Sequence, residues 1–385
     1  MSKPTGPIVA VADKEMPLIK GRLLRAFRSL QKGVTIRGIM ESWVRGGDQG
    51  VMNYIRVERL EKALSGLLNI PFYAGYFAEK RNLKFLLGIQ KAEFKDELGF
   101  NLKFDGSNPE VESFLQATNL AFVGNVTNAT RETIRSTISR AFVEGGNPRL
   151  QARQIRDSIG VLSQHEQAIR NFRLQLTERS NAPGGHAMRP AHLRRLFESD
   201  KRSVRQHMLN GTFSQKHIDE MVDVYQDRLI DYRAEMITRT ETLRAAHAGQ
   251  QALWKQATDE GLLPDTARRK WVFTKDERTR ESHKAIPKLN AHGVKVGEAF
   301  KTSFGPVFHP PAGPNCRCTV VLDPDAGEKE VIGSSSPNTI TLEETVRPIV
   351  FDQQVRTPAI VAGALATEVV VSAIAEEVVF EENIL

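Results

Sequence analysis

Helical periodicity constrains the first two thirds of this chain more than any other feature. Between residues 128 and 142 the apolar residues Ile134, Ile138, Ala141 and Phe142 recur at i, i+4, i+7 and i+8, which is one stripe of a helix. Comparable stripes continue to about residue 261, and strand-like alternation is scarce over this range. The sequence therefore predicts a mainly helical body.

Capping signals place several helix ends. Gly145-Gly146 is expected to end one helix, and Asn147 followed by Pro148 is typical of the start of the next. Ser214 is expected to cap a long helix that runs to about residue 257. Some forty residues span roughly 60 Å at 1.5 Å per residue, which is more than one small domain needs. This helix either breaks or forms an arm or strut within an assembly.

The pattern changes at Pro264. Short β-prone runs such as KWVF, HGVKV and CTVVL are separated there by Gly and Pro, as in a small mixed α/β unit. The predicted fold class is α+β: a mainly helical body with long helices, then a small mixed motif unit and an extended or partly ordered C-terminal tail. The expected divisions are an N-terminal helical region, a helical domain, the motif unit, and a linker with the tail, at residues 1–110, 111–262, 263–325 and 326–385.

Charge is distributed unevenly along the chain. The formal net charge is +7, yet residues 331–385 hold eight acidic residues against two arginines, so the body is more basic than the total suggests. A basic body favours a polyanion such as nucleic acid, and a solvated surface without a ligand is the alternative. A phosphate-facing patch, or else a solvated helix face, is expected at Arg189, Arg194, Arg195, Lys201, Arg202 and Arg205.

The tail contains an apolar stretch of 19 residues, 357–375, which is long enough to cross a membrane. Glu368 lies near its middle, many of its residues are weakly apolar, and no basic anchor stands beside it. We therefore expect the tail to dock on a partner or on the body of the chain, and we do not expect membrane contact.

The chain has two cysteines, separated by one residue. Two thiols cannot form a disulfide framework, so a reducing cytoplasm is the expected folding compartment. Thiolates favour zinc, and a tetrahedral site needs two further ligands, commonly histidines. The candidate ligands are His283, His309, Cys316 and Cys318, with His292 in reserve. A metal-free pair of packed cysteines and a redox or catalytic thiol remain as alternatives.

The motif unit contains WVFTKDERTRESH at residues 271–283, then Gly293, Phe300, a Pro-rich turn and NCRC at 315–318. With these motifs in this order, the unit resembles the phage head-morphogenesis proteins, the Mu F-like minor capsid proteins. Upstream, the Arg-Thr-Glu triplet at 239–241 and the helical stretch at 116–176 are also similar, so the resemblance covers about 116–325. Some members have C-x-x-C where this chain has Arg280 and His283, which weakens a metal inference from those members.

The motif residues suggest a polar network. Asp276 and Arg278, alternating at a strand end, are expected to clamp a turn, while Arg280 and Arg317 are expected to meet Glu241, other buried carboxylates or phosphates. The network either fastens the motif unit to the long helix or contacts DNA. The residues assigned to it are Arg239, Glu241, Trp271, Asp276, Arg278, Arg280, Asn315 and Arg317.

The resemblance implies a structural virion protein and not an enzyme. Such proteins act in head assembly, are associated with the portal protein or major capsid protein near packaged DNA, and in some cases are ejected with the genome; the expected location is the virion, after assembly in the host cytoplasm. The alternative is a zinc-assisted nuclease or other DNA-acting enzyme, using His283 and His309, a carboxylate from Asp276 or Glu241, and Arg280. No H-N-H, H-E-x-x-H, G-x-S-x-G or phosphate-binding Gly loop supports it. A plain DNA-binding module is the third hypothesis.

Overall fold

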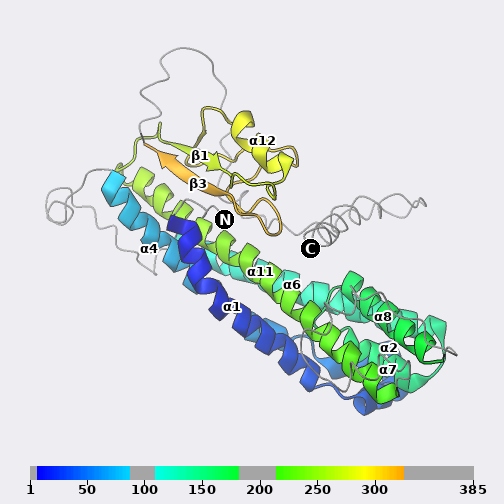
Figure 1. The fold of residues 1–385 in the computed structure, drawn as a ribbon. Helices are drawn as coiled ribbons and strands as arrows, with labels where there is room; N and C mark the ends of the chain where they lie inside the picture. The colour runs from blue at the N-terminus through cyan, green and yellow to red at the C-terminus, as the bar shows by residue number, and fades with distance from the viewer. Residues whose placement is uncertain (1–6, 87–108, 182–213, 325–385) are drawn as a thin grey trace, which may run out of the picture. The chain divides into compact units, whose positions relative to one another are not determined.

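The computed structural model describes residues 7–86, 109–181 and 214–324 (Figure 1). A run of helices comes first and a small three-stranded sheet follows, which confirms the predicted α+β class. The predicted basic patch at 189–205 and the tail from 326 lie outside the described residues. The elements, in order, are α1 (Pro7–Lys32), α2 (Ile36–Ile55), α3 (Arg59–Leu64), α4 (Asn69–Leu86), α6 (Pro109–Glu144), α7 (Pro148–Asp157), α8 (Ser163–Asn181), α11 (Gln215–Asp259), β1 (Arg268–Val272), α12 (Glu281–Leu289), β2 (Val294–Lys295) and β3 (Thr319–Asp323).

The helix starts follow the capping signals. The Asn147 side chain accepts a hydrogen bond from the Arg149 amide at 3.0 Å, with Pro148 in the first turn of α7. Ser214 accepts from the His217 amide and begins α11. This helix has 45 residues, about 68 Å at 1.5 Å per residue, and is unbroken. Of the two outcomes expected for it, the structure shows the continuous helix.

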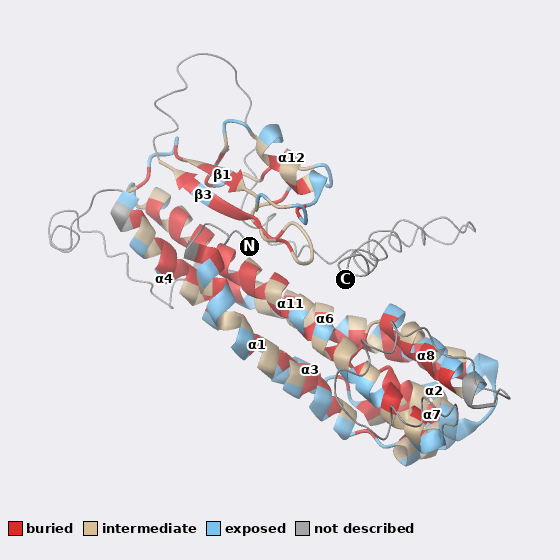
Figure 2. Cartoon of the chain, in the orientation of Figure 1, coloured by how far each residue is buried: buried red, intermediate tan, exposed pale blue. Residues whose placement is uncertain are grey.

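One core joins the helices. Buried residues from both sides of the expected boundary at 110 belong to the same apolar cluster, for example Phe27, Leu67, Ile138, Ile155 and Ile230. Figure 2 shows the buried faces of these helices turned toward their neighbours. Helices α1 and α4 both pack along α11, so the long helix is the element that the first two predicted regions share.

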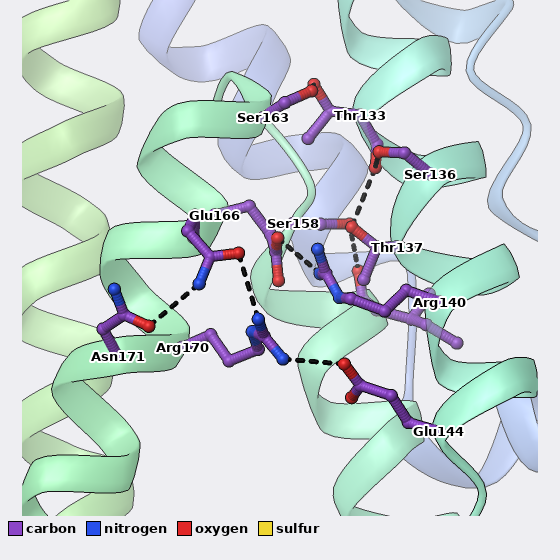
Figure 3. Close-up of polar contacts among 12 residues, drawn as sticks. Thr133, Ser136, Thr137, Arg140, Glu144, Ser158, Ser163, Glu166, Arg170 and Asn171 are labelled. Carbon is purple, nitrogen blue, oxygen red and sulfur yellow. Dashed lines mark hydrogen bonds and ion pairs between the residues drawn. The ribbon is translucent and has the colours of Figure 1, made fainter. Parts of the chain in front are cut away.

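Polar contacts also fasten the helices to one another (Figure 3). Between α6 and α8, Arg140 forms an ion pair with Glu166, and Arg170 donates to Glu144 at 2.8 Å. On α11 the buried Arg233 side chain donates to the Val161 carbonyl oxygen at 3.0 Å and to other acceptors on α6. Burial lowers the pKa of Arg233 to about 9. These bonds tie the middle of α11 to its neighbours.

The sheet has the strand order β2-β1-β3, and both pairings are antiparallel. Trp271 on β1 lies opposite Val320 on β3 and packs edge-on to the Phe300 ring at 5.2 Å between centroids. The apolar cluster around it includes Tyr76 of α4 and Trp254 of α11. The motif unit therefore completes its core against the helices.

Among the described residues, no helix combines the length and the apolar character needed to cross a membrane. The stretch at 357–375 lies outside the described residues, so its predicted docking stays a prediction.

Candidate metal centre

Three of the four predicted ligands meet inside the motif unit. His283 lies in the first turn of α12, and Cys316 and Cys318 lie just before β3. All three side chains are buried, both cysteines are free thiols, and one potential ligand atom from each lies within 4.8 Å of the others. The fold therefore brings His283 and the two cysteines, which are more than thirty residues apart in the sequence, into one cluster of metal-donor atoms.

The distances in this cluster fit a tetrahedral ion. The Nδ1 atom of His283 is 3.6 Å from the sulfur of Cys316 and 3.6 Å from that of Cys318. In a tetrahedral zinc site, bonds of about 2.3 Å to sulfur and about 2.0–2.1 Å to nitrogen separate those two atoms by about 3.6 Å. A single imidazole nitrogen can make only one linear hydrogen bond, whereas an ion binds all three donors at once. The donor set can therefore hold zinc.

The cluster also favours removal of a proton from one of the two thiols, that of Cys316. A hydrogen bond from Cys318 holds the pKa of Cys316 below the usual thiol range, against the effect of burial. The same hydrogen bond, together with burial, raises the pKa of Cys318. The indole of Trp271 acts in the opposite sense on Cys318, and its buried N–H has no other hydrogen-bond partner. Anionic sulfur is the form in which cysteine binds metal.

The remaining histidine candidates lie outside this cluster. The Nδ1 atom of His309 is 2.8 Å from the Pro310 carbonyl oxygen, and its ring faces that of His247 at 6.3 Å between centroids. Burial lowers the pKa of His309 to about 3, so the ring is neutral. His292 is exposed. The structure therefore brings together His283, Cys316 and Cys318, without His309.

The motif turn differs from the expected one. Strand β1 ends at Val272, so Asp276 and Arg278 lie in a turn and not at a strand end. The Asp276 carboxylate accepts from the backbone amide of Arg278 at 3.1 Å and from the Arg317 guanidinium, with one contact at 2.8 Å. Arg317 is the main cause of the lowered pKa of Asp276. The charged partner of Asp276 is thus Arg317, because the turn points its carboxylate toward the NCRC segment.

The Arg-Thr-Glu triplet contacts the NCRC segment through its threonine. The backbone amide of Asn315 donates to the Thr240 hydroxyl at 3.3 Å, and Asn315 has the left-handed φ of 55° that asparagine tolerates. The buried Glu241 is instead bound by Arg244 of the same helix, at 2.9 and 3.0 Å. The expected contact of Glu241 with the motif arginines is therefore replaced by an intrahelical pair.

The other two arginines assigned to the network have separate surroundings. Arg280 donates to the Pro314 carbonyl oxygen at 3.0 Å, within the motif unit. Arg239 lies on the exposed side of α11, 3.4 Å from Glu235. Of the assigned residues, Asp276, Arg280 and Arg317 hold the motif unit together, while Asn315 fastens it to α11.

Sequence reasoning missed the most buried cation of the motif unit, Arg269. Its guanidinium donates to Gln251 of α11 at 2.7 Å and to the Phe308 carbonyl oxygen at 2.9 Å, and it lies 4.4 Å from the Phe308 ring centroid. Burial lowers its pKa to about 9. The run Arg268-Arg269-Lys270 reads as a solvated basic stretch, so the sequence carried no signal for this role.

A second group of missed residues lies on α11. The amide nitrogen of Gln250 donates to Glu79 of α4 at 2.9 Å, and its oxygen lies 2.9 Å from Nδ1 of His247. Trp254 donates to the other oxygen of Glu79, also at 2.9 Å. Burial raises the pKa of Glu79. Polar residues at i, i+3 and i+7 on an otherwise apolar helix face were the available signal.

Comparison with known proteins supports the predicted resemblance over its C-terminal part. Residues 198–321 match the family model described as Phage Mu protein F like protein, so this segment is similar to that family. The matched range contains α11 and nearly all of the motif unit, and it is about a third of the chain. No curated protein and no solved structure matches the chain.

Proposed function

We propose that this chain is a structural head-morphogenesis protein of a phage, a minor virion component and not an enzyme. The match of residues 198–321 to the Phage Mu protein F like family carries the proposal. The motifs that define the resemblance hold the fold together, since Asn315 of the NCRC segment binds Thr240 of the Arg-Thr-Glu triplet. Contacts of this kind are consistent with a structural role in assembly of the phage head.

Three of the groups that the nuclease alternative would use are engaged within the protein. Asp276 is bound by Arg317 and by the turn backbone, and Glu241 is bound by Arg244. His309 is directed at the Pro310 carbonyl oxygen. A carboxylate committed to a fixed internal cation is a poor general base, so these pairings favour the structural role over the enzymatic alternative.

We further propose that the protein lies inside the head or at the portal vertex, bound to the portal protein or the major capsid protein. The formal charge of +7 suits a position near packaged DNA, because lysine and arginine gain affinity for phosphates through release of counterions. Ejection with the genome and assembly in the host cytoplasm belong to the same proposal.

Zinc would give the motif unit a stability that its size does not provide. The unit has two five-residue strands and one of two residues, and it depends on the helices for part of its core. A structural ion held by His283, Cys316 and Cys318 would link α12 to the segment before β3. When bound, zinc would cross-link these two segments. The fold would hold the sulfurs of Cys316 and Cys318 and the imidazole of His283 in position for it.

The test locates the chain in intact virions by crosslinking and mass spectrometry, with the full-length protein. We expect crosslinks to the portal protein or major capsid protein, and loss of incorporation when Arg317→Ala weakens the motif unit. The control is Arg239→Ala, on the exposed side of α11, which should incorporate normally. Purified protein that cleaves DNA, and loses that activity in His283→Ala while still entering virions, would instead support the nuclease.

A further inference from the structure

His247 of α11 carries a buried nitrogen that the fold leaves unused. The side chain is 1% exposed, and its Nε2 atom has no hydrogen-bond partner. Leaving such an atom unpaired in the interior is unfavourable, because it has given up its hydrogen bond to water. An unpaired buried imidazole nitrogen therefore needs an explanation, and a bound ion is one that the surroundings can supply.

The hydrogen bonds around His247 fix which ring nitrogen holds the proton. The amide nitrogen of Gln250 faces Glu79 at 2.9 Å and the Val320 carbonyl oxygen at 3.5 Å, and a carbonyl oxygen can only accept. The Gln250 oxygen consequently faces His247, so the Nδ1 atom of His247 must be the donor. The Nε2 atom of His247 then carries a free lone pair, which is the form in which a neutral histidine binds a metal.

The position of His247 along α11 places it beside the two cysteines. Residues 240, 247 and 250 share one face of the helix, since they are separated by seven and three positions. Thr240 binds the amide of Asn315, and Gln250 approaches the carbonyl of Val320. The segment that contains both cysteines therefore runs along this face between two anchors, with His247 between them.

The electrostatics of His247 agree with this position. Burial lowers the pKa of His247 to about 4, while the hydrogen bond with Gln250, the charge of Cys316 and the backbone of Cys318 act in the opposite direction. His165 in the helical body has the same low pKa of about 4 and also a buried nitrogen without a partner, yet its ring packs against Tyr232 of α11. Burial and an unpaired nitrogen therefore do not by themselves identify a metal ligand. His247 differs from His165 in having thiols nearby.

We infer that His247 is the fourth ligand of the metal centre, so that the ion joins the motif unit to the long helix. This inference rests on the zinc proposal for His283, Cys316 and Cys318. The Nε2 atom of His247 is not among the donor atoms that lie within 4.8 Å of one another, so ligation requires the cysteine segment to approach α11. The resulting set of two sulfurs and two nitrogens is typical of a closed structural zinc site.

The consequence is a bridge between two parts of the chain. Without His247 an ion would cross-link α12 and the segment before β3 only. With it, the ion would also fix that segment on α11, in line with the Asn315–Thr240 hydrogen bond. Carboxylate–His–metal relays orient ligands in many proteins, and here Glu79 acts on His247 through Gln250.

Cobalt substitution of the full-length chain tests the inference, because Co²⁺ in a tetrahedral sulfur and nitrogen site has a characteristic visible spectrum. We expect one ion per chain in the wild type. In His247→Ala we expect the affinity for zinc, measured by chelator competition, to fall by at least about tenfold. The cobalt absorption bands should also shift and weaken, because water replaces a nitrogen ligand.

The matched control is His165→Ala, which removes a histidine of similar burial and pKa and should leave the spectrum and affinity unchanged. His247→Gln provides a second variant that keeps a polar side chain at the site, in case the alanine variant does not fold; circular dichroism of the metal-free proteins checks this. It should show the same loss of affinity and the same spectral shift.

Three results would overturn the inference. A wild-type spectrum and affinity in folded His247→Gln would show that His247 is not a ligand, while the three-residue centre would stand. Loss of the ion in His309→Ala, with His247→Gln unaffected, would transfer the role to His309. A wild-type chain that binds neither zinc nor cobalt would remove the metal centre itself, and the virion experiment would still test the head-morphogenesis proposal separately.

Discussion

Arg317 and Asp276 form a two-point ion pair across 41 residues of sequence, and Arg317 stands between the two cysteines. The carboxylate belongs to the turn that precedes α12, and the guanidinium belongs to the segment that precedes β3. Because successive side chains alternate in an extended segment, an outward Arg317 leaves both cysteines directed inward. The pair therefore helps to present the donor cluster that His283 completes.

We expect Asp276 and Arg317 to be energetically coupled. Both side chains are about one third exposed, so solvent reduces the strength of the pair, and a coupling of about 1 kcal/mol in the free energy of unfolding is expected. A double-mutant cycle with Asp276→Asn and Arg317→Met, followed by urea denaturation, measures it. The control cycle uses the exposed pair Lys255–Asp259 on α11, for which about 0.3–0.5 kcal/mol is expected. Equal couplings in the two cycles would contradict the prediction.

Gly249 is expected to be irreplaceable at the crossing of α4 and α11. A Cβ atom at this position would collide with the backbone of Phe72, and the reciprocal contact exists between Gly75 and Ala246. Gly249→Ala should therefore lower the free energy of unfolding by about 2 kcal/mol or more, as overpacking against backbone does.

Gly124 on α6 is the matched control for Gly249, because it is also helical but has open space around the position of a Cβ. Gly124→Ala should stabilise the protein by about 0.5–1 kcal/mol, through the higher helix propensity of alanine. Thermal and urea denaturation of both variants measure the effects. A Gly249→Ala protein as stable as the wild type would show that the two helices do not pack this closely.

Protonation of His165 should weaken the fold in mild acid. Burial lowers its pKa from 6.5 to about 4, so between these values the unfolded chain binds more protons than the folded chain. The contribution is fully present above pH 6.5 and is lost as the pH falls toward 4, at about 1.4 kcal/mol per pH unit and about 3 kcal/mol in all.

His165→Gln cannot take up this proton, so the variant should lose less stability than the wild type between pH 6.5 and 4. Urea denaturation at several pH values measures the difference in the free energy of unfolding. Parallel curves for the two proteins would contradict a buried neutral His165.

Removal of the proposed zinc should destabilise the whole chain. A ligand that binds only the folded state stabilises it by about 2.7 kcal/mol at one hundred times its dissociation constant. A strong chelator should therefore lower the melting temperature of the wild type and leave that of Cys316→Ser/Cys318→Ser unchanged. Elemental analysis of the purified wild type, expected to give about one zinc per chain, accompanies the melting curves. An identical response in both proteins would argue for a metal-free cysteine pair.

The sequence by itself determined the secondary-structure elements, because these depend on interactions between residues close together in the chain. Apolar spacing predicted the helical body, Asn147 and Ser214 marked helix starts through their capping side chains, and the runs after Pro264 predicted the small sheet. The cysteine spacing and the order of the motifs predicted a compact unit with His283 near the thiols. The helices, their starts and the strand segments depend on residues within a few positions of one another, where propensity and hydrogen bonding act directly.

Only the tertiary structure decided which side chains interact with one another. It paired Asp276 with Arg317 and buried Arg269 against Gln251, while His309 turned to its neighbouring carbonyl. The first two of these pairings join residues far apart in the chain, and they follow from how whole helices and strands pack, so the periodicity of one element cannot encode them.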